Sequence, residues 1–323
     1  MLNKKNVIDY LKNRVTNHKV IVVGDIMLDR YFYGNVTRIS PEAPVPVTLI
    51  KEKKNVLGGA ANVANNLKKM GVEVFLVGGI ANDHHGRLLM SKLNELHINI
   101  KGVGIYKEST TTKSRIIGGH QQMIRIDFEE TNELSGMYAR KIVSDINDIV
   151  KNNKIDAIII SDYGKGVCTN SVCKEIMRLD IPCFIDPKGD DWSKYNSADF
   201  ITPNIKEIEA VIGREIKNET EQLSLIGKEL LEKYHLGNII ITRSEKGLSV
   251  FNNYNSFSVP TVAHEVYDVS GAGDTVIAAF VTVLIGGFSI EDSAVMANIA
   301  AGIGCGKVGT YAVSRKEIID ALE

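Results

Sequence analysis

A short polar stretch at residues 268–275, DVSGAGDT, holds two acids, two glycines and two hydroxyls and leads straight into the apolar run 276–285. Gly271 and Gly273 allow backbone amides to approach a ligand closely, and the free amides of a first helical turn lie at the positive end of the helix dipole. This pattern predicts an anion site that suits phosphate. Asp274 would repel a phosphate there unless it takes part in the reaction, for example by accepting a proton from an attacking hydroxyl. A capped helix start without a ligand is the alternative.

Two further segments place an acid and a lysine together directly after an apolar run: Asp162 with Lys165, and Asp186 with Lys188. A lysine in such a position neutralises a phosphate, whereas the acid binds sugar hydroxyls or a hydrated magnesium ion. Turns alone are a poor explanation for the same arrangement twice. We expect Asp186 to hold magnesium through water.

Acids and glycines also gather near the beginning of the sequence. Asp25 and Asp29 follow the first apolar run, where their carboxylates can accept hydrogen bonds from sugar hydroxyls; a turn with capping acids is the alternative. Gly58 and Gly59 open the next helix and permit close backbone approach to a ligand, with Asn62 as both donor and acceptor.

Two later segments are suited to a nucleotide. Asn204 and Glu207 lie three residues apart at a predicted helix start, so they share a face. Glu207 is either a capping-box acid or a group that holds magnesium-bound waters beside a triphosphate. The turn at residues 242–247 offers hydroxyls, a base and a glycine beside a nucleotide phosphate, and a polar hairpin explains it equally well.

Regular elements must place these residues. Runs at residues 20–23, 74–77, 157–160, 183–185 and 239–242 predict buried strands, and segments 62–70, 86–96, 135–150, 171–179 and 220–234 predict helices between them. Segments 274–285, 290–306 and 314–322 predict closing helices. The alternation favours an α/β fold, a mostly parallel sheet with helices on both faces, and one domain over residues 1–323. Ligands then bind at the carboxyl ends of the strands.

Two stretches, at about residues 31–54 and 110–129, interrupt this alternation with the period-two pattern of strands. We expect them to form a small separate sheet that serves as a lid over the site. The lid carries Arg38, Lys113, Arg115 and Arg125, which either keep an edge-rich sheet soluble or grip an anionic substrate. Its exposed edges also suggest a homodimer in which two lids pair.

The chain has 323 residues, with 38 Lys and Arg against 39 Asp and Glu, which favours a small-molecule partner over nucleic acid or an anionic membrane. We find no targeting segment and no long apolar span, so we expect a cytoplasmic protein.

The four cysteines lack CxxC spacing and are expected to be buried thiols. Residues 301–308 differ from a P-loop at its first glycine and its last hydroxyl, and no GxGxxG follows a strand.

Two signatures, GGAAN at residues 58–62 and DVSGAGD at residues 268–274, occur in the order seen in the ribokinase-like (PfkB) carbohydrate kinases, and essentially the whole chain resembles this family. The resemblance implies a ribokinase-like fold, ATP and Mg²⁺ as cofactors, Asp274 as catalytic base, and an anion hole formed by Gly271, Ala272 and Gly273. It implies ATP contacts from Asn204, Glu207, Thr242, Ser244, Gly247 and Asn298. Asp268 and Ser270 match positions that bind a monovalent cation in some members.

Longer blocks at residues 24–31, 38–47, 121–130 and 265–269 resemble the family members that phosphorylate D-glycero-β-D-manno-heptose 7-phosphate. This resemblance implies phosphoryl transfer from ATP to the anomeric 1-hydroxyl, a step in the biosynthesis of ADP-heptose for the lipopolysaccharide core. In bifunctional relatives a nucleotidyltransferase domain follows the kinase. The sequence here ends before one, so we expect a separate protein to supply the later adenylyl transfer.

The sugar phosphate is expected to bind between the lid and the strand ends. The residues predicted to contact it are Asp25, Asp29, Arg38, Gly58, Gly59, Asn62, Lys113, Arg115, Asp127, Asp162, Lys165 and Lys188. Two other interpretations stay open. One is a ribokinase-like kinase for another sugar phosphate or a nucleoside, and the other is a non-catalytic sugar- or nucleotide-binding regulator of the same fold.

Overall fold

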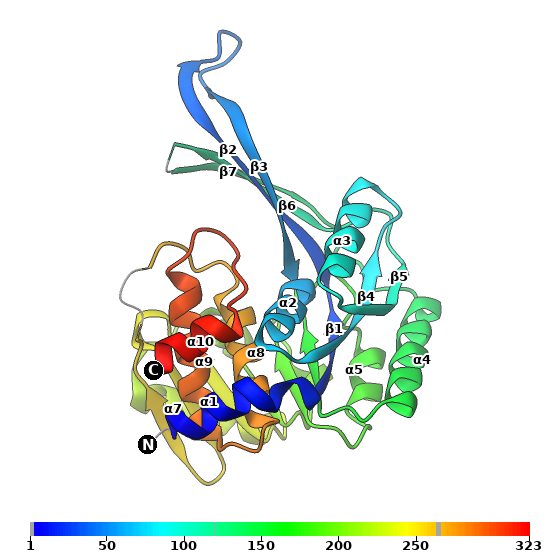
Figure 1. Cartoon of the computed structure of the whole chain (residues 1–323), viewed down its shortest axis with the longest axis vertical. Coiled ribbons are helices and arrows are strands. Elements are labelled where there is room, and N and C mark those ends of the chain that lie inside the picture. The colour runs from blue at the N-terminus through cyan, green and yellow to red at the C-terminus, as the bar shows by residue number, and fades with distance from the viewer. Residues whose placement is uncertain (1–2, 120, 263–265) are drawn as a thin grey trace.

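The computed structural model describes residues 3–119, 121–262 and 266–323, so Glu265, part of a block quoted above, lies outside the described residues. The described residues form an α/β body from which a long two-stranded hairpin projects (Figure 1). Their strands make two sheets, one of nine strands in the body and one of four strands at the base of the hairpin.

The body sheet has the strand order β13-β12-β11-β10-β9-β8-β1-β4-β5. Every neighbouring pair from β5 to β11 is parallel, and β12 and β13 add an antiparallel edge. The strands are β1 Lys19–Gly24, β4 Glu73–Ile80, β5 Asn99–Ile105, β8 Ala157–Ser161, β9 Cys183–Asp186, β10 Phe200–Ile201, β11 Asn238–Thr242, β12 Leu248–Asn252 and β13 Ser256–Val259.

Helices cover both faces of this sheet, because β-branched residues along each central strand point alternately to the two sides. In β1, Val20 and Val22 pack into one apolar cluster with α1, α2, α3, α8, α9 and α10, while Ile21 and Val23 pack into another with α4, α5, α6 and α7. The helices are α1 Lys4–Asn13, α2 Ala60–Met70, α3 His84–Glu95, α4 Gly136–Asn152, α5 Asn170–Ile176, α6 Ile205–Ile212, α7 Thr220–Lys233, α8 Ala272–Leu284, α9 Ile290–Cys305 and α10 Arg315–Leu322.

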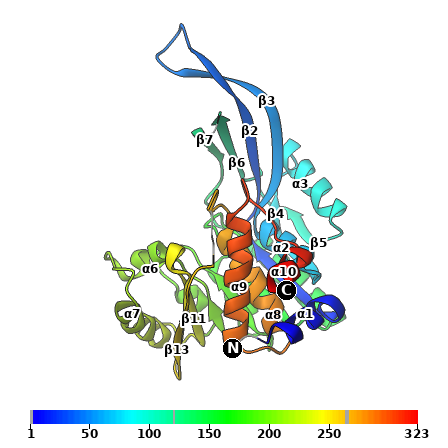
Figure 2. The same ribbon diagram turned by 60° about the vertical axis from the view of Figure 1, so that its left-hand side comes forward.

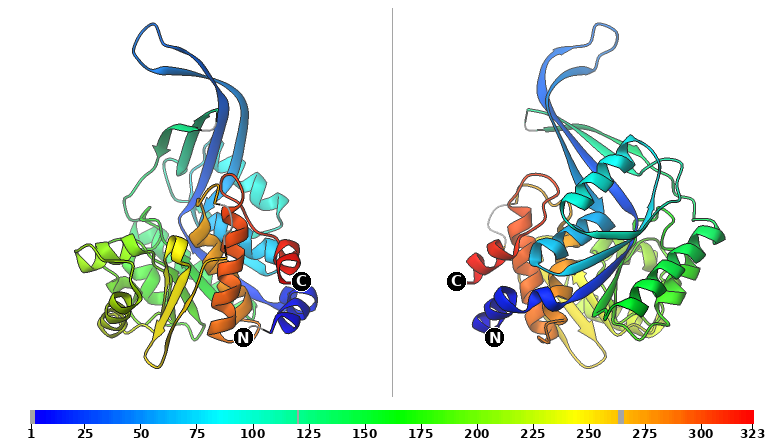
Figure 3. Two further views of the ribbon diagram at one scale, coloured as in Figure 1. Left: turned by 90° about the vertical axis from the view of Figure 1, so that its left-hand side faces the viewer. Right: turned by 45° about the vertical axis from the view of Figure 1, so that its right-hand side comes forward.

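The predicted fold class is confirmed: a mostly parallel sheet lies between two helical layers, and a small second sheet is separate from it. The helix α1 was not predicted, since its first residues are polar. It forms because Val7, Tyr10 and Leu11 lie on one face and are buried against the body. It also contacts α10, which brings the two ends of the chain to the same side (Figure 3).

The second sheet, here called the lid, has the order β3-β2-β6-β7, with β2 Ile26–Ile39, β3 Pro46–Gly59, β6 Thr112–Gly118 and β7 Gln121–Phe128. Strand β2 begins, and strand β3 ends, nearer the body than predicted. Both strands also extend beyond β6, whose pairing with β2 stops at Gly34. The remainder of β2 and β3 therefore forms the projecting hairpin (Figure 2).

Other sequence expectations have mixed outcomes. Residues 301–305, in the stretch that resembles a P-loop, lie in α9 and are helical rather than a loop. Cys168, Cys173 and Cys183 are buried free thiols, but Cys305 is only partly buried. Among the described residues, no helix is both long and apolar enough to cross a bilayer.

Candidate active site

Asp274 lies in the first turn of α8, which begins after Gly271 at a positive φ of 80°. Its side chain is held at both oxygens. The Nδ2 of Asn62 donates to Oδ2 at 2.6 Å, and the hydroxyl of Tyr163 donates to Oδ1 at 2.7 Å. The residue is only 3% exposed, so the orientation of the carboxylate is set by these two donors.

Burial raises the pKa of Asp274 from 3.8 to about 6, and the charge of Asp29 adds to the rise, whereas the hydrogen bonds from Asn62 and Tyr163 limit it. Desolvation disfavours the charged form of an acid, and donors to the carboxylate favour it. A carboxylate with a pKa near neutrality is suited to accept a proton during a reaction.

The two glycines before Asp274 have different surroundings. A Cβ on Gly271 would lie 2.8 Å from Nδ2 of Asn62 and 3.1 Å from Cγ2 of Thr310, so this glycine makes room for the contact between Asn62 and Asp274. A Cβ on Gly273 would meet nothing within 4 Å. Gly273 therefore faces open space at the positive end of the α8 dipole, where an anion is stabilised.

That open space is a hollow of about 390 Å³ between the start of α8, α9 and the β11–β12 turn. Its lining combines the helix start with four of the predicted nucleotide-binding residues: Ala272, Gly273, Thr242, Ser244, Gly247 and Asn298. Apolar side chains such as Leu248 and Val276 line it as well, which suits an aromatic base. The Nδ2 of Asn298 donates a hydrogen bond to the carbonyl oxygen of Pro260 at 2.7 Å.

Asn204 and Glu207 lie outside this lining. They form a capping box at the start of α6: Oδ1 of Asn204 accepts from the amide of Glu207 at 3.0 Å, and Oε2 of Glu207 accepts from the amide of Asn204 at 2.9 Å. The other carboxylate oxygen of Glu207 pairs with Nζ of Lys188 at 3.4 Å. The helix-capping alternative for these two residues is therefore present in the structure.

Asp186 ends β9 among other acids. Burial and the charges of Asp274 and Glu207 hold its pKa well above the usual range, with Lys188 opposing them. Gathered carboxylate oxygens of this kind fit Mg²⁺, which prefers oxygen ligands and keeps several waters. Within the described ranges no set of three or more His, Cys, Asp or Glu side chains is arranged to bind a metal directly.

Asp25 is fully buried and accepts three backbone hydrogen bonds from the loop after β8. The amides of Tyr163 and Lys165 donate to Oδ2, each at 2.9 Å, and the amide of Val167 donates to Oδ1 at 3.1 Å. In this arrangement Asp25 holds the loop that carries Tyr163 and Lys165, rather than facing the open side of the site.

Gly58 and Gly59 let β3 pass close to Asp29 of β2 and to Asp25, which lies between β1 and β2. A Cβ on Gly58 would lie 2.4 Å from Oδ2 of Asp29, and a Cβ on Gly59, at a φ of 55°, would lie 2.4 Å from the carbonyl oxygen of Asp25. The close approach that the sequence suggested is thus made by the chain's own acidic residues.

Asp29 is buried and paired. Nη1 of Arg115 donates to its Oδ1 at 2.5 Å, and Oγ1 of Thr310 donates to Oδ2 at 3.4 Å. The guanidinium of Arg115 also lies over the ring of Tyr31. Strands β2 and β6 thus bring a paired acid and base close enough to Asp274 for the charge of Asp29 to act on it.

A charged face of the lid continues from this pair. Lys113 lies opposite Asp29 on β2 and opposite Asp127 on β7, so the three side chains share one side of the sheet. Burial lowers the pKa of Lys113, against the opposing charges of Glu129 and Asp127. Lys165 reaches the same region from the body and pairs with Glu129 at 2.8 Å.

Two predicted substrate residues lie elsewhere. Arg38 is on the projecting hairpin, beyond the last pairing of β2 with β6, so the fold does not bring it to Asp274 of the same chain. Asp162 points into the body, where Tyr195 and Lys194 each bond its Oδ2 at 2.6 Å and the amide of Gly164 bonds Oδ1. These three groups account for an acid that the sequence assigned to a sugar.

Sequence reasoning missed Tyr163 and Thr310 as site residues. Tyr163 lies between Asp162 and Lys165, but a single tyrosine forms no sequence pattern that predicts a binding or catalytic role. Thr310 follows α9 and meets Tyr31 through a contact of 3.0 Å between hydroxyls, across 279 positions of the chain. Only the fold brings such residues together.

The predicted cation residues Asp268 and Ser270 border a small enclosed space beside α9, together with Thr275 and Tyr311. Asp268 accepts hydrogen bonds from the amides of Ser270, at 2.8 Å, and Gly309, at 3.1 Å. These contacts explain the local turn without an ion, and a monovalent cation stays a prediction.

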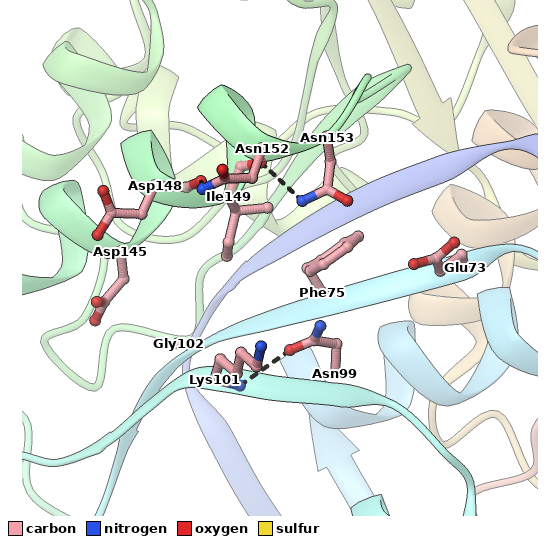
Figure 4. Close-up of a pocket in the computed structure, with 10 residues that line it drawn as sticks. All are labelled: Glu73, Phe75, Asn99, Lys101, Gly102, Asp145, Asp148, Ile149, Asn152 and Asn153. Carbon is pink, nitrogen blue, oxygen red and sulfur yellow. Dashed lines mark hydrogen bonds between the residues drawn. The ribbon is translucent and has the colours of Figure 1, made fainter.

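A second hollow of about 440 Å³ lies at the other end of the body sheet, between the first halves of β4 and β5 and the last half of α4 (Figure 4). Acidic and amide side chains such as Asp145, Asp148 and Asn152 line it. None of the predicted site residues is among its lining residues, so the chemistry described above belongs to the carboxyl ends of the strands.

The pfkB family carbohydrate kinase model matches residues 17–317 of this chain. Among curated relatives, the bifunctional protein HldE of Haemophilus influenzae (strain PittEE) is 42% identical over 307 residues, which cover 94% of this chain and 63% of that protein. HldE of Geobacter sulfurreducens is 41% identical over 308 residues, which cover 94% of this chain and 62% of that protein. The chain thus spans less than two thirds of the length of these relatives.

Solved structures agree on the fold. Phosphofructokinase-2 from Escherichia coli, in complex with potassium, superposes with a TM-score of 0.78 at 16% identity, over 94% of this chain and 98% of that chain. Arabidopsis thaliana ribokinase, complexed with ribose and ATP, gives 0.74 at 20% identity, over 95% and 98%. The ribokinase-like fold is therefore confirmed. Since the family model spans nearly the whole chain, this protein belongs to the pfkB family of carbohydrate kinases.

Proposed function

We propose that this protein transfers the γ-phosphate of ATP to the anomeric 1-hydroxyl of D-glycero-β-D-manno-heptose 7-phosphate, giving the 1,7-bisphosphate and ADP. The observation that carries the proposal is the position of Asp274, buried at the start of α8 between the 390 Å³ hollow and the charged face of the lid. The long sequence blocks shared with heptose 7-phosphate kinases and the 42% identity to HldE support the choice of sugar.

In the proposed reaction Asp274 accepts the proton of the 1-hydroxyl as its oxygen bonds to the γ-phosphorus. The bond from that phosphorus to the bridging oxygen breaks, and ADP leaves with the electron pair. A loose transition state makes alignment and charge stabilisation the main sources of rate. The start of α8 at Gly271, Ala272 and Gly273 would stabilise the transferring oxygens, and Lys188, which pairs with Glu207, would add positive charge.

Magnesium would be held through water by Asp186 and Glu207, whose charges repel each other in its absence. When bound, it supplies positive charge to the triphosphate. The hollow beside α8 would hold the nucleotide, and Thr242, Ser244, Gly247 and Asn298 line it. A monovalent cation at Asp268 and Ser270 is a further part of this proposal.

For the sugar phosphate, we propose that Lys113, Arg115 and Lys165 surround the 7-phosphate and that Asp29, Asn62 and Asp127 hold hydroxyls. Arg115 pairs with Asp29 and Lys165 pairs with Glu129, so an incoming phosphate would replace these carboxylates as their partner. The lid, at about residues 31–54 and 110–129 of a single kinase domain, would exclude water from the activated phosphoryl group.

We also propose a homodimer through the lid. The edge strand β7 exposes Ile124, Ile126 and Phe128 on the side of the lid away from Asp127, with exposed fractions of 55%, 42% and 54%. An apolar face along an open edge is a site for pairing with another copy. The later adenylyl transfer would then act on the product of this dimer.

A coupled assay of ADP release over a panel of sugar phosphates, unphosphorylated sugars and nucleosides tests the proposal. We expect the heptose 7-phosphate to give the highest kcat/KM. A higher value with another acceptor would replace the substrate but keep the kinase, while no ADP release with any acceptor would favour a non-catalytic regulator.

A further inference from the structure

Tyr163 is the residue outside the predicted site that makes the most direct contact with it. Its hydroxyl donates to Oδ1 of Asp274 at 2.7 Å, while Nδ2 of Asn62 donates to Oδ2. Burial and the charge of Asp274 hold the pKa of Tyr163 well above its usual value, so the phenol stays neutral and remains a donor.

The backbone around Tyr163 is fixed. Its amide donates to the buried Asp25, as do the amides of Lys165 and Val167. Gly166 has a φ of 92°, and a Cβ there would lie 2.0 Å from the carbonyl oxygen of Asn132, so the loop fits only with glycine. A phenol mounted on such a loop has little freedom to leave Asp274.

The groups around Asp274 have opposing effects on its charge. Asp29 from β2 and Asp186 from β9 are acids that disfavour the ionised form, and Arg115 from β6 neutralises part of Asp29. Asn62 from α2 and Tyr163 are neutral donors that favour it. Loss of either donor is therefore expected to raise the pKa of Asp274 further.

We propose that Tyr163 is a positioning residue for Asp274: its hydroxyl fixes the direction of the carboxylate and keeps it in the charged form that accepts the proton of the sugar. Asp25 acts one step further away, by fixing the loop on which Tyr163 stands. This inference rests on the proposed kinase activity, in which Asp274 is the base.

The test compares Tyr163→Phe with the unsubstituted protein and with Tyr10→Phe. Tyr10 is a matched control, because its buried hydroxyl also makes one hydrogen bond to α8, to the carbonyl of Thr282 at 2.8 Å, at a distance from the site. A hydrogen bond to a charged group contributes enough that its loss is expected to lower kcat by about 10- to 100-fold near pH 7.

The pH profile separates positioning from general damage. Without Tyr163 the pKa of Asp274 rises, so the acid limb of kcat/KM moves to higher pH and the deficit shrinks as the pH is raised. The KM for ATP stays unchanged, and Tyr10→Phe keeps the original limb. A Tyr163→Phe protein with unaltered kcat, or with a loss equal at all pH values, overturns the proposal.

A second readout does not depend on turnover. Titration of the whole protein, followed by ¹³C NMR of its labelled aspartate carboxyls, is expected to show the Asp274 signal titrating at higher pH in Tyr163→Phe than in the unsubstituted protein. An identical midpoint in the two proteins overturns the role of Tyr163. Inactivity of the unsubstituted protein contradicts the proposed function instead, so the two failures are told apart.

Discussion

At the scale of single residues, the proposed chemistry depends on Asp274, a buried acid whose two oxygens are held by neutral donors. We expect Asp274→Asn to lower kcat by about 10²- to 10⁴-fold, because an amide cannot accept the proton of the attacking hydroxyl. Binding of ATP, measured by calorimetry, is expected to persist. Turnover close to that of the unsubstituted protein would remove Asp274 from its role as base.

The pKa of about 6 for Asp274 sets the expected pH dependence. The carboxylate accepts a proton only when it is ionised, and it is ionised above that pKa. The kcat/KM for the sugar phosphate is therefore expected to be constant at alkaline pH and to fall tenfold per pH unit below about 6. A profile that stays flat down to pH 5 would contradict the burial-driven rise of the Asp274 pKa.

Lys165 tests which groups hold the substrate phosphate. Its side chain is 12% exposed, and its ammonium pairs with Glu129. Lys165→Ala is expected to raise the KM for the heptose 7-phosphate much more than the KM for the same sugar without its phosphate. Lys141→Ala, on the exposed face of α4, is a control that removes a paired lysine far from the lid. Equal effects on both substrates would assign Lys165 to the loop alone.

At the scale of elements, the start of α8 holds two glycines with different tasks. Gly271→Ala places a Cβ against Asn62 at positive φ, so we expect a loss of stability of about 1–3 kcal/mol, seen as a lower midpoint of urea unfolding, together with lost activity. Gly273→Ala puts a Cβ into the open hollow, so the fold is kept and the KM for ATP rises. Equal unfolding midpoints for the two variants would show that the structural difference is unimportant.

The elements also show how far sequence reasoning reaches. The body strands and most helices were predictable, because β-branched runs and three-four apolar spacing are local patterns that burial then reinforces. The DVSGAGDT stretch was recognised as a helix start for the same reason. The full length of β2 and β3 was not, since residues 26–30 and 55–59, which extend these strands beyond the expected 31–54, hold an acid and two glycines that suggested a binding loop and a helix start.

Site contacts were predictable only in part. Asp274, Asn62 and Asp29 come together as their strand ends and helix starts implied. In contrast, Asp162 follows β8, and Lys194 lies 32 positions later, in a short 3-10 turn beyond α5 and β9. The identity of the donor that meets a given acid depends on side chains distant in sequence, and spacing along the chain does not report it.

At the scale of the whole molecule, the proposed dimer gives a direct test. Ile126→Asp puts a charge on the exposed apolar side of β7 and is expected to give a monomer in sedimentation at micromolar concentration, where the unsubstituted protein sediments as a dimer. Ile105→Asp is the matched control, a similarly exposed isoleucine at the end of β5, on the body. A monomeric unsubstituted protein would dispose of the lid dimer.

The strand β2 has a further consequence for the molecule. It is continuous from Asp29, beside the base, to Ile39 on the projecting hairpin, and β3 pairs with it along this length. We expect a displacement of the hairpin to reach Asp29 and Lys113, which is paired across from it, to the extent that the two register shifts between Tyr33 and Arg38 do not absorb it. Contacts that fix the hairpin, including contacts with another copy of the chain, would therefore also affect the distance between the proposed sugar-binding groups and Asp274. Substrate affinity and subunit association would then be thermodynamically linked, so that each changes the other by the same factor.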